Sequence, residues 1–177
     1  MTACRTIILM GLRGAGKSTI GAALAKASGL PCVEIDDLAA ARLAARDAGD
    51  AIRTHGLDAF RHAESTVLGE ALAAASPCVI CLGGGTPTAP GAADTLRAAG
   101  TRMAIVYLRA TPATLRQRLA ATDLSSRPSL TGRHPLEEID EVFALRDPLY
   151  RELATEVIEV DPLGQEAIVI RAMQLTS

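Results

Sequence analysis

The chain has 177 residues, of which 49% are hydrophobic and 21% are charged, and its formal net charge is −2. This length is enough for one domain with a sizeable core. The nearly neutral charge gives no reason to expect nucleic-acid or membrane binding, and no apolar run is long enough to span a bilayer. The first residues lack the pattern of a signal peptide, so we expect a cytoplasmic protein.

Short apolar runs that suit strands alternate with longer helical patterns, which is typical of a parallel sheet covered by helices on both faces. We expect strands at residues 6–10, 31–35, 78–82, 102–108 and 156–160. We expect helices at residues 17–28, 37–48, 57–75, 91–99, 112–120, 136–153 and 164–174. Residues 122–135 are rich in Ser, Thr, Pro, Gly and Arg and fit neither pattern, so we interpret them as a lid. The chain as a whole, residues 1–177, is expected to form one α/β domain.

The four cysteines are Cys4, Cys32, Cys78 and Cys81. The spacing of Cys78 and Cys81 is found in metal sites, but these two residues lie on an expected strand. Residues three apart on a strand face opposite sides of the sheet and cannot share a metal. We therefore interpret all four cysteines as small buried hydrophobic residues.

The most specific motif is Gly11-x-x-x-x-Gly16-Lys17-Ser18, which follows an expected strand and opens an expected helix. Glycines let backbone N–H groups converge on phosphate oxygens, and the helix N-terminus adds a favourable dipole. Lys17 would neutralise the β- and γ-phosphates of a nucleoside triphosphate, and the Ser18 hydroxyl would ligate Mg²⁺. The predicted nucleotide-binding residues of this loop are Gly14, Ala15, Gly16, Lys17, Ser18 and Thr19.

A second glycine run, Gly83-Gly84-Gly85, directly follows an expected strand. Ligands of open parallel sheets bind beyond the carboxyl ends of the strands, so this run is expected at the edge of the site. Three glycines would let the backbone press against a compact ligand, although a flexible turn is the alternative interpretation.

Glu34 and Asp36 flank Ile35 at the end of the second expected strand, so both carboxylates are expected to point the same way. One would hold a substrate hydroxyl, and the other would support Mg²⁺ through water. The alternative role for Asp36 or Asp37 is that of a helix N-cap.

Arg61 and Glu64 share one face of an expected helix, where an ordinary surface ion pair is the default. Arg146 by itself would be a solvated helix residue. In order and spacing, however, the motifs together resemble the shikimate kinase family across nearly the whole chain. The matching elements are the phosphate loop, the acidic strand end, Phe60-Arg61-x-x-Glu64, Gly83-Gly84-Gly85, Arg127-Pro128 and Arg146-x-Pro148-Leu149-Tyr150.

The resemblance implies a three-layer P-loop kinase fold, similar to nucleoside monophosphate kinases, with a five-stranded parallel sheet of order 2-3-1-4-5 flanked by helices, plus a lid. It implies a shikimate kinase of chorismate and aromatic amino-acid biosynthesis, and we expect this enzyme to be a monomer. Such an enzyme transfers the γ-phosphate of ATP to the 3-hydroxyl of shikimate, with ATP and Mg²⁺ as cofactors. The substrate-binding subdomain would span about residues 36–64.

The resemblance also implies roles for single residues. Asp36 would hold or deprotonate the shikimate hydroxyl, while Arg61 and Arg146 would clamp the carboxylate, a task suited to guanidinium geometry. Glu64 would orient Arg61, and Gly84 and Gly85 would contact the ring hydroxyls, with Gly83 also in the substrate site. Arg127 in the lid would stabilise the transferring phosphoryl group. Arg118 would stack on adenine, its alternative being a surface arginine.

The chain departs from the family pattern at three positions. Glu34 stands in place of an aspartate, which leaves its magnesium role open; Leu57 replaces a glutamate, and Ser129 replaces a leucine in the lid. None of these changes removes a charge that the expected chemistry requires. The alternatives are a related small-molecule kinase of the gluconate type and a ligand-sensing module without catalysis. Such a module would be expected to lose Asp36 or Arg127, and both are present.

Overall fold

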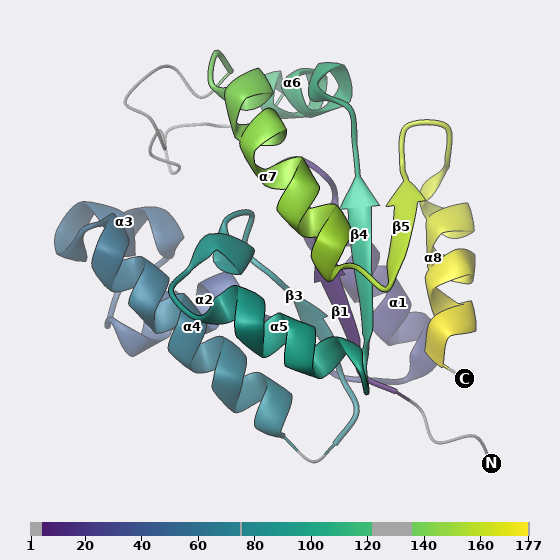
Figure 1. The fold of residues 1–177 in the computed structure, drawn as a ribbon, viewed down its shortest axis with the longest axis horizontal. Helices are drawn as coiled ribbons and strands as arrows, with labels where there is room; N and C mark the ends of the chain where they lie inside the picture. The colour runs from purple at the N-terminus through teal and green to yellow at the C-terminus, as the bar shows by residue number, and fades with distance from the viewer. Residues whose placement is uncertain (1–4, 75, 122–135, 177) are drawn as a thin grey trace.

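The computed structural model describes residues 5–74, 76–121 and 136–176. Five strands form one sheet. They are β1 (Ile7–Met10), β2 (Cys32–Glu34), β3 (Val79–Cys81), β4 (Ala104–Arg109) and β5 (Glu156–Glu159). Figure 1 labels β1, β3, β4 and β5. The order across the sheet is β2-β3-β1-β4-β5, and every pairing is parallel. The predicted strands, their order and the predicted fold class are confirmed.

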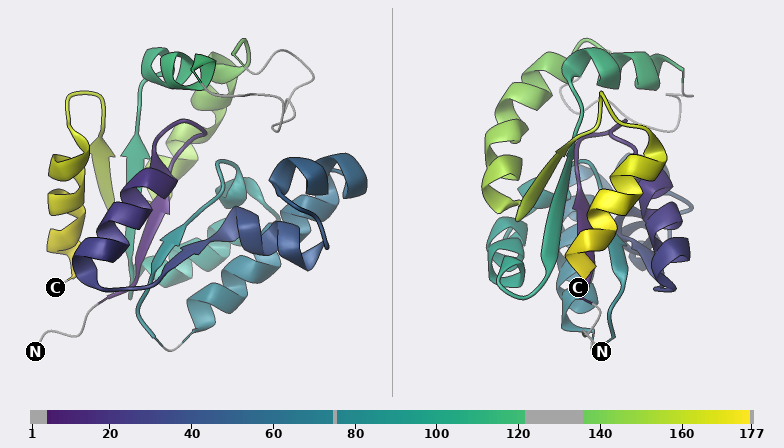
Figure 2. Two further views of the ribbon diagram at one scale, coloured as in Figure 1. Left: turned by 180° about the vertical axis from the view of Figure 1, so that it is seen from behind. Right: turned by 90° about the vertical axis from the view of Figure 1, so that its right-hand side faces the viewer.

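Eight α-helices and two short 3₁₀ helices occur in the described part of the chain. The α-helices are α1 (Lys17–Ser28), α2 (Ile35–Arg42), α3 (Ala48–His55), α4 (Leu57–Ala73), α5 (Ala92–Gly100), α6 (Pro112–Ala120), α7 (Ile139–Leu153) and α8 (Gln165–Met173). The 3₁₀ helices are η1 (Thr86–Thr88) and η2 (Gln174–Thr176). Helices α1 and α8 cover one face of the sheet, and α5 and α7 cover the other (Figure 2). None of the helices described here combines the length and apolar character that crossing a bilayer requires.

The core follows from the position of each strand in the sheet. Strands β1 and β3 are buried along their whole length, as expected for inner parallel strands that helices cover on both faces. Strand β2 lies at the edge, and its first residue, Cys32, is exposed. The prediction that Cys32 is a buried residue is therefore wrong. Cys78 and Cys81 are buried as predicted, and Cys4 lies outside the described residues.

The predicted helix at residues 37–48 is wrong, because the chain forms two helices in this region. Helix α2 ends at Arg42, and Ala44 then adopts a φ of 54°, which interrupts the helical path. Helix α3 starts after Asp47, whose side chain accepts a hydrogen bond from the N–H of Asp50 at 2.8 Å. Helices α2, α3 and α4 pack on one another beside the sheet, in the region predicted to bind the substrate (Figure 1).

The carboxyl ends of parallel strands open at one edge of a sheet. The segments that follow β1, β2, β3 and β4 at this edge are the phosphate loop, α2, the glycine run with η1, and the start of α6. The fold thus brings the predicted donor and acceptor residues to the same edge.

Candidate active site

The loop between β1 and α1 has the backbone shape that its motif predicts. Gly14 and Gly16 have φ angles of 85° and 96°, which favour glycine over residues with a Cβ. Gly16 directly precedes α1, and no side chain of the described residues caps that helix. The first residues of α1 line a cavity, so their N–H groups and the helix dipole are placed to bind an anion there.

Two cations lie against this loop. Lys17 Nζ donates a hydrogen bond to Leu12 O at 3.1 Å. Arg118 in α6 donates from Nη1 to Gly14 O at 3.3 Å and to Ala15 O at 3.2 Å. The loop therefore carries a lysine and an arginine close to the position where the phosphates of a nucleotide would lie.

Ser18 and Glu34 lie next to each other beside the loop. Ser18 Oγ donates a hydrogen bond to Glu34 Oε2 at 3.3 Å. Burial raises the pKa of Glu34 above its usual range, and the hydrogen bond from Ser18 opposes that rise. A hydroxyl and a carboxyl oxygen at one position suit a hard cation such as Mg²⁺.

Asp36 reaches the site from a helix. Strand β2 ends at Glu34 and α2 begins at Ile35, so the predicted alternation of Glu34 and Asp36 along a strand is wrong. Glu34 occupies the N-cap position of α2, which also excludes the alternative that Asp36 or Asp37 is the cap. Both Glu34 and Asp36 nevertheless line the same cavity, because the first turn of α2 stays at the carboxyl edge of the sheet.

Glu64 is the buried centre of the acceptor side. Its side chain is fully buried and forms an ion pair with Arg61, one turn earlier in α4. Glu64 Oε1 also accepts a hydrogen bond from Thr86 Oγ1 at 2.5 Å. Burial raises the pKa of Glu64, although the charge of Arg61 opposes the shift. The predicted pair of Arg61 and Glu64 is thus formed, with Glu64 buried and Arg61 at the wall of a cavity.

The glycine run is a site of close approach rather than a flexible turn. A Cβ at Gly83 would overlap Asp36 Oδ1 and would lie 2.6 Å from Glu64 Oε1. A Cβ at Gly85 would overlap the guanidinium group of Arg61. Glycine at these two positions therefore leaves the space that the acidic and basic side chains occupy.

Gly84 connects this run to α7. Its carbonyl oxygen accepts a hydrogen bond from Arg146 Nη1 at 2.9 Å and another from Tyr150 OH at 2.8 Å. Tyr150 is fully buried, and burial raises the pKa of its hydroxyl to about 12, so this hydroxyl remains a donor at neutral pH. Arg146 is thereby held at the edge of the acceptor site.

A polar cluster holds α7 against β4. Asp147 Oδ1 accepts hydrogen bonds from Tyr107 OH at 2.9 Å and from Arg109 Nε at 2.7 Å, while its Oδ2 accepts from Arg151 Nε at 2.9 Å. Burial opposes ionisation, but these hydrogen bonds keep the pKa of Asp147 below its usual range. The rings of Tyr107 and Tyr150 meet edge to face at 5.6 Å.

One cavity of about 680 Å³ joins the two halves of the site. The predicted residues that line it are Gly14, Ala15, Gly16, Lys17, Ser18, Thr19, Glu34, Asp36, Arg61, Gly84, Gly85, Arg118 and Arg146. Glu64 and Gly83 lie behind this surface, where they contact Arg61 and Asp36. Arg127, Ser129 and the predicted lid lie outside the described residues.

The family model for shikimate kinase matches residues 13–176 of this chain. A protein of Syntrophotalea carbinolica named shikimate kinase 2 is 38% identical over 174 residues, which cover 97% of this chain and 96% of that protein. The chain belongs to the shikimate kinase family. This is a family of ATP-dependent kinases, which agrees with the phosphate loop at one end of the cavity.

Solved structures agree with this family membership. A shikimate kinase from Acinetobacter baumannii in complex with shikimate has a TM-score of 0.86 and 28% identity, covering 98% of this chain and 93% of that one. A gluconokinase from Sinorhizobium meliloti has a TM-score of 0.69 and 23% identity, covering 98% and 92%. At that identity, the likeness to the gluconokinase shows only a shared fold.

Several residues that line the cavity were not predicted as site residues. They are Asp47, Ala48, Gly49 and Ile52 around α3, and Leu163, Gln165 and Ile168 around α8. Helix α3 itself was not predicted, so its residues could not be placed. Asp47 followed by Asp50 is a helix-start pattern that could have revealed it. The residues around α8 carry no distinctive chemistry, and only their position after β5 brings them to the site.

Proposed function

We propose that this protein transfers the γ-phosphate of ATP to the 3-hydroxyl of shikimate, giving shikimate 3-phosphate and ADP. The observation that carries the proposal is the single cavity that has the phosphate loop at one end and Asp36, Arg61 and Arg146 at the other. Its volume of about 680 Å³ lies in the usual range for small-molecule sites. The arginines favour a carboxylated acceptor over a neutral sugar.

At the donor end, the N–H groups at the start of α1 and the ammonium group of Lys17 would hold the phosphates of ATP. Arg118 contacts two carbonyls of the loop, which supports the proposal that its guanidinium plane would stack on adenine. Leu163 and Ile168 line the same cavity and would cover the base with apolar surface.

The residues beside the phosphate loop fit Mg²⁺. Ser18 Oγ and Glu34 Oε2, 3.3 Å apart, are hard oxygen donors, which this cation prefers. Ser18 would ligate the ion directly, and the longer reach of Glu34 would place its carboxylate on a water of the ion. Bound there, Mg²⁺ would neutralise negative charge on the phosphates.

At the acceptor end, Arg61 and Arg146 would bind the shikimate carboxylate. Arg61 is oriented by its buried ion pair with Glu64, and Arg146 by its hydrogen bond to Gly84. Two planar guanidinium groups on different helices, α4 and α7, would fix both the position and the rotation of a carboxylate. The backbone at Gly84 and Gly85 would lie against the ring.

Asp36 would act on the hydroxyl that receives the phosphoryl group. The hydroxyl oxygen attacks the γ-phosphorus, the bond from that phosphorus to the bridging oxygen breaks, and the hydroxyl proton passes to the Asp36 carboxylate. Most of the catalysis in such a transfer comes from positioning and charge neutralisation. Lys17 supplies charge in the described part of the site. Arg127 of the predicted lid is proposed to supply more.

We also propose that the enzyme works as a monomer in the cytoplasm, where ATP is available. Light scattering coupled to size-exclusion chromatography measures the mass directly, with 18.4 kDa expected for one chain.

The test is an ADP-release assay with ATP and Mg²⁺ in three arms: shikimate, gluconate and no acceptor. We expect ADP release that depends on shikimate. Gluconate-dependent release would instead identify a gluconate-type kinase. Nucleotide binding without ADP release in any arm would favour a ligand-sensing module.

Asp36→Asn tests the acceptor assignment, with Asp58→Asn as its matched control. Asp58 is an exposed residue in the first turn of α4. We expect Asp36→Asn to lose at least about 100-fold in kcat, in line with the loss of a general base, while its affinity for ATP is retained. Asp58→Asn should behave like the unmodified enzyme. Full turnover in Asp36→Asn would exclude Asp36 from the reaction.

A further inference from the structure

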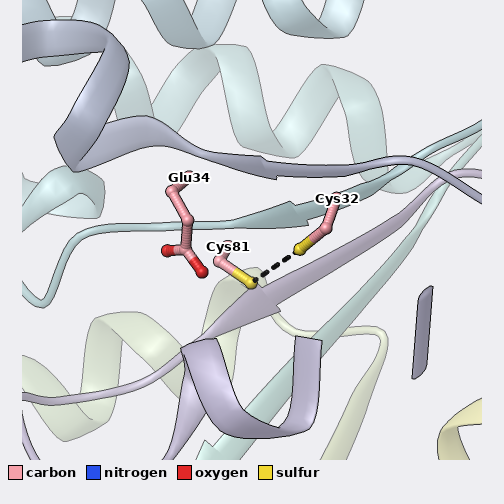
Figure 3. A group of neighbouring side chains, drawn as sticks. All are labelled: Cys32, Glu34 and Cys81. Carbon is pink, nitrogen blue, oxygen red and sulfur yellow. Dashed lines mark hydrogen bonds between the residues drawn. The ribbon is translucent and has the colours of Figure 1, made fainter. Parts of the chain in front are cut away.

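Three side chains with metal-binding atoms meet on one face of the sheet, next to the phosphate loop. Cys32 and Glu34 alternate along β2, and Cys81 is paired with Glu34 in the register of β2 with β3. Because alternate residues of a strand share a face, all three side chains project to the same side. Figure 3 shows the carboxylate of Glu34 and the two thiols turned toward one another.

The spacing of the two sulfur atoms is close to that of a tetrahedral metal site, and the Glu34 carboxylate lies near enough to move in. Cys32 Sγ and Cys81 Sγ lie 3.9 Å apart, and the three potential ligand atoms all lie within 4.8 Å of one another. Zinc–sulfur bonds of about 2.3 Å in a tetrahedral site put two sulfur ligands about 3.8 Å apart. The sulfur atoms therefore already have the separation that a bound ion needs.

Helix α1 leaves room for these sulfur atoms at one residue. A Cβ at Gly21 would overlap Cys81 Sγ and would lie 3.4 Å from Cys32 Sγ. Cys81 is buried at the inner end of the cluster, whereas Cys32 is exposed and Glu34 is partly exposed. An ion can therefore enter from the side of Cys32 and Glu34 and meet Cys81 at the bottom.

We propose that Cys32, Glu34 and Cys81 form a site for a thiophilic divalent cation such as Zn²⁺, and that occupation of this site inhibits the kinase. Two thiolates and one carboxylate are ligands that zinc accepts, whereas Mg²⁺ takes oxygen ligands. On binding, the two thiols release their protons to the solvent and no redox change occurs. Three protein ligands leave the fourth position to water.

Inhibition follows because Glu34 belongs both to the proposed zinc site and to the proposed magnesium site. In the structure, its Oε2 atom accepts a hydrogen bond from Ser18, the residue proposed to ligate Mg²⁺. A cation held by the two sulfur atoms draws the Glu34 carboxylate toward itself and away from Ser18 and the magnesium position. The binding site stands independently of the proposed function, whereas the inhibition rests on it.

The first experiment measures binding on the fully reduced protein under anaerobic conditions. Cd²⁺ is titrated as a spectroscopic probe, and absorption in the ultraviolet from sulfur-to-metal charge transfer reports thiolate ligation. The affinity for Zn²⁺ is then measured by competition with a chromogenic chelator. We expect one ion per chain, with absorption that corresponds to two thiolates.

Cys32→Ser is the decisive variant, because Cys32 is exposed and its replacement leaves the core intact. Loss of residues that merely support a ligand costs about 10–100-fold in metal affinity, so loss of a direct ligand should cost at least about 100-fold. Cys78→Ser is the control, because Cys78 lies outside the cluster, and it should keep the full charge-transfer signal. A missing signal in the unmodified protein, or a full signal in Cys32→Ser, would overturn the site.

The second experiment measures ADP release in excess Mg²⁺ after the protein has been loaded with Zn²⁺ and freed of the excess. The unmodified enzyme should lose most of its activity and regain it on addition of a chelator. Cys32→Ser should have unchanged basal activity and resist zinc. Bound zinc without inhibition would overturn the regulatory half of the proposal. Absence of shikimate-dependent ADP release from the metal-free enzyme would refute the proposed function instead and leave the binding result untouched.

Discussion

The substitution Gly83→Ala is expected to displace the acceptor-side carboxylates without straining the backbone. The φ angle of Gly83 is not positive, so an alanine can adopt this conformation. The added Cβ would, however, overlap Asp36 Oδ1 and lie 2.6 Å from Glu64 Oε1, whereas ordinary contact begins at 3.4 Å. Glu64 must therefore retreat by about 0.8 Å, and Asp36, which lies closer, must move further.

The size of the effect follows from these displacements. A shift of about 1 Å in a catalytic group can cost about 100-fold in rate, which corresponds to about 2.7 kcal/mol. Overpacking in the surrounding core should also lower the free energy of unfolding by about 1–3 kcal/mol. The assay is shikimate-dependent ADP release, combined with a fluorescent ATP analogue for nucleotide affinity and with thermal denaturation. We expect kcat to fall about 100-fold while nucleotide affinity is unchanged.

Gly69→Ala is the matched control for this substitution. Gly69 lies within α4, and a Cβ there would have no neighbour within 4 Å. Its replacement should leave turnover unchanged and stabilise the helix by about 0.5–1 kcal/mol. The predicted displacement would be refuted if Gly83→Ala had the turnover and thermal stability of the unmodified enzyme. Asp36 and Glu64 would then move aside without loss of activity or stability.

Three further predictions concern other contacts. Arg61→Lys keeps the positive charge but loses the planar guanidinium fork. The KM for shikimate should therefore rise about 10–100-fold, while the KM for ATP stays unchanged. Equal rises in both KM values would contradict the assignment of Arg61 to the shikimate carboxylate. The pKa of Asp147 is lowered from 3.8, so its stabilising contribution is present above that value and is lost as the pH falls below it. Asp147→Asn should consequently lower Tm more at about pH 7 than at about pH 3, and an equal loss at both would exclude the ionic contribution. Gly21→Ala should lower the free energy of unfolding by about 1–3 kcal/mol, because the added Cβ clashes with Cys81. The double variant Gly21→Ala/Cys81→Ala should recover most of this loss. If the double variant is no more stable than Gly21→Ala alone, the clash lies elsewhere.

The sequence was sufficient to predict the sheet because its strands are short runs of apolar residues separated by helical patterns. It was not sufficient for residues 37–48, because the alanine-rich run has high helix propensity up to and beyond the point where the helix ends. The break occurs at Ala44, which adopts a φ of 54°, between two helices that both pack on α4. Local propensity carries no information about that packing.

The sequence motifs were sufficient to propose which residues belong to the site, but not which contacts they form. Lys17 was assigned to the site from the spacing of the phosphate-loop motif, and Arg61 from the family resemblance; both line the cavity. The hydrogen bond from Thr86 to Glu64 could not be predicted, because it joins segments that meet only in the folded chain. The cysteines show the same limit: Cys78 and Cys81 were compared along one strand, whereas the contact that forms joins Cys81 to Cys32 on the neighbouring strand.

The shared carbonyl of Gly84 has a consequence for the timing of substrate binding. Arg146 and Tyr150 both donate to this oxygen, at 2.9 and 2.8 Å. If Arg146 binds the substrate carboxylate as proposed, it would give up this hydrogen bond while Tyr150 keeps the partly buried carbonyl satisfied. In the proposed enzyme, Tyr150 would thus lower the cost of moving the Arg146 guanidinium from the glycine run to the substrate carboxylate.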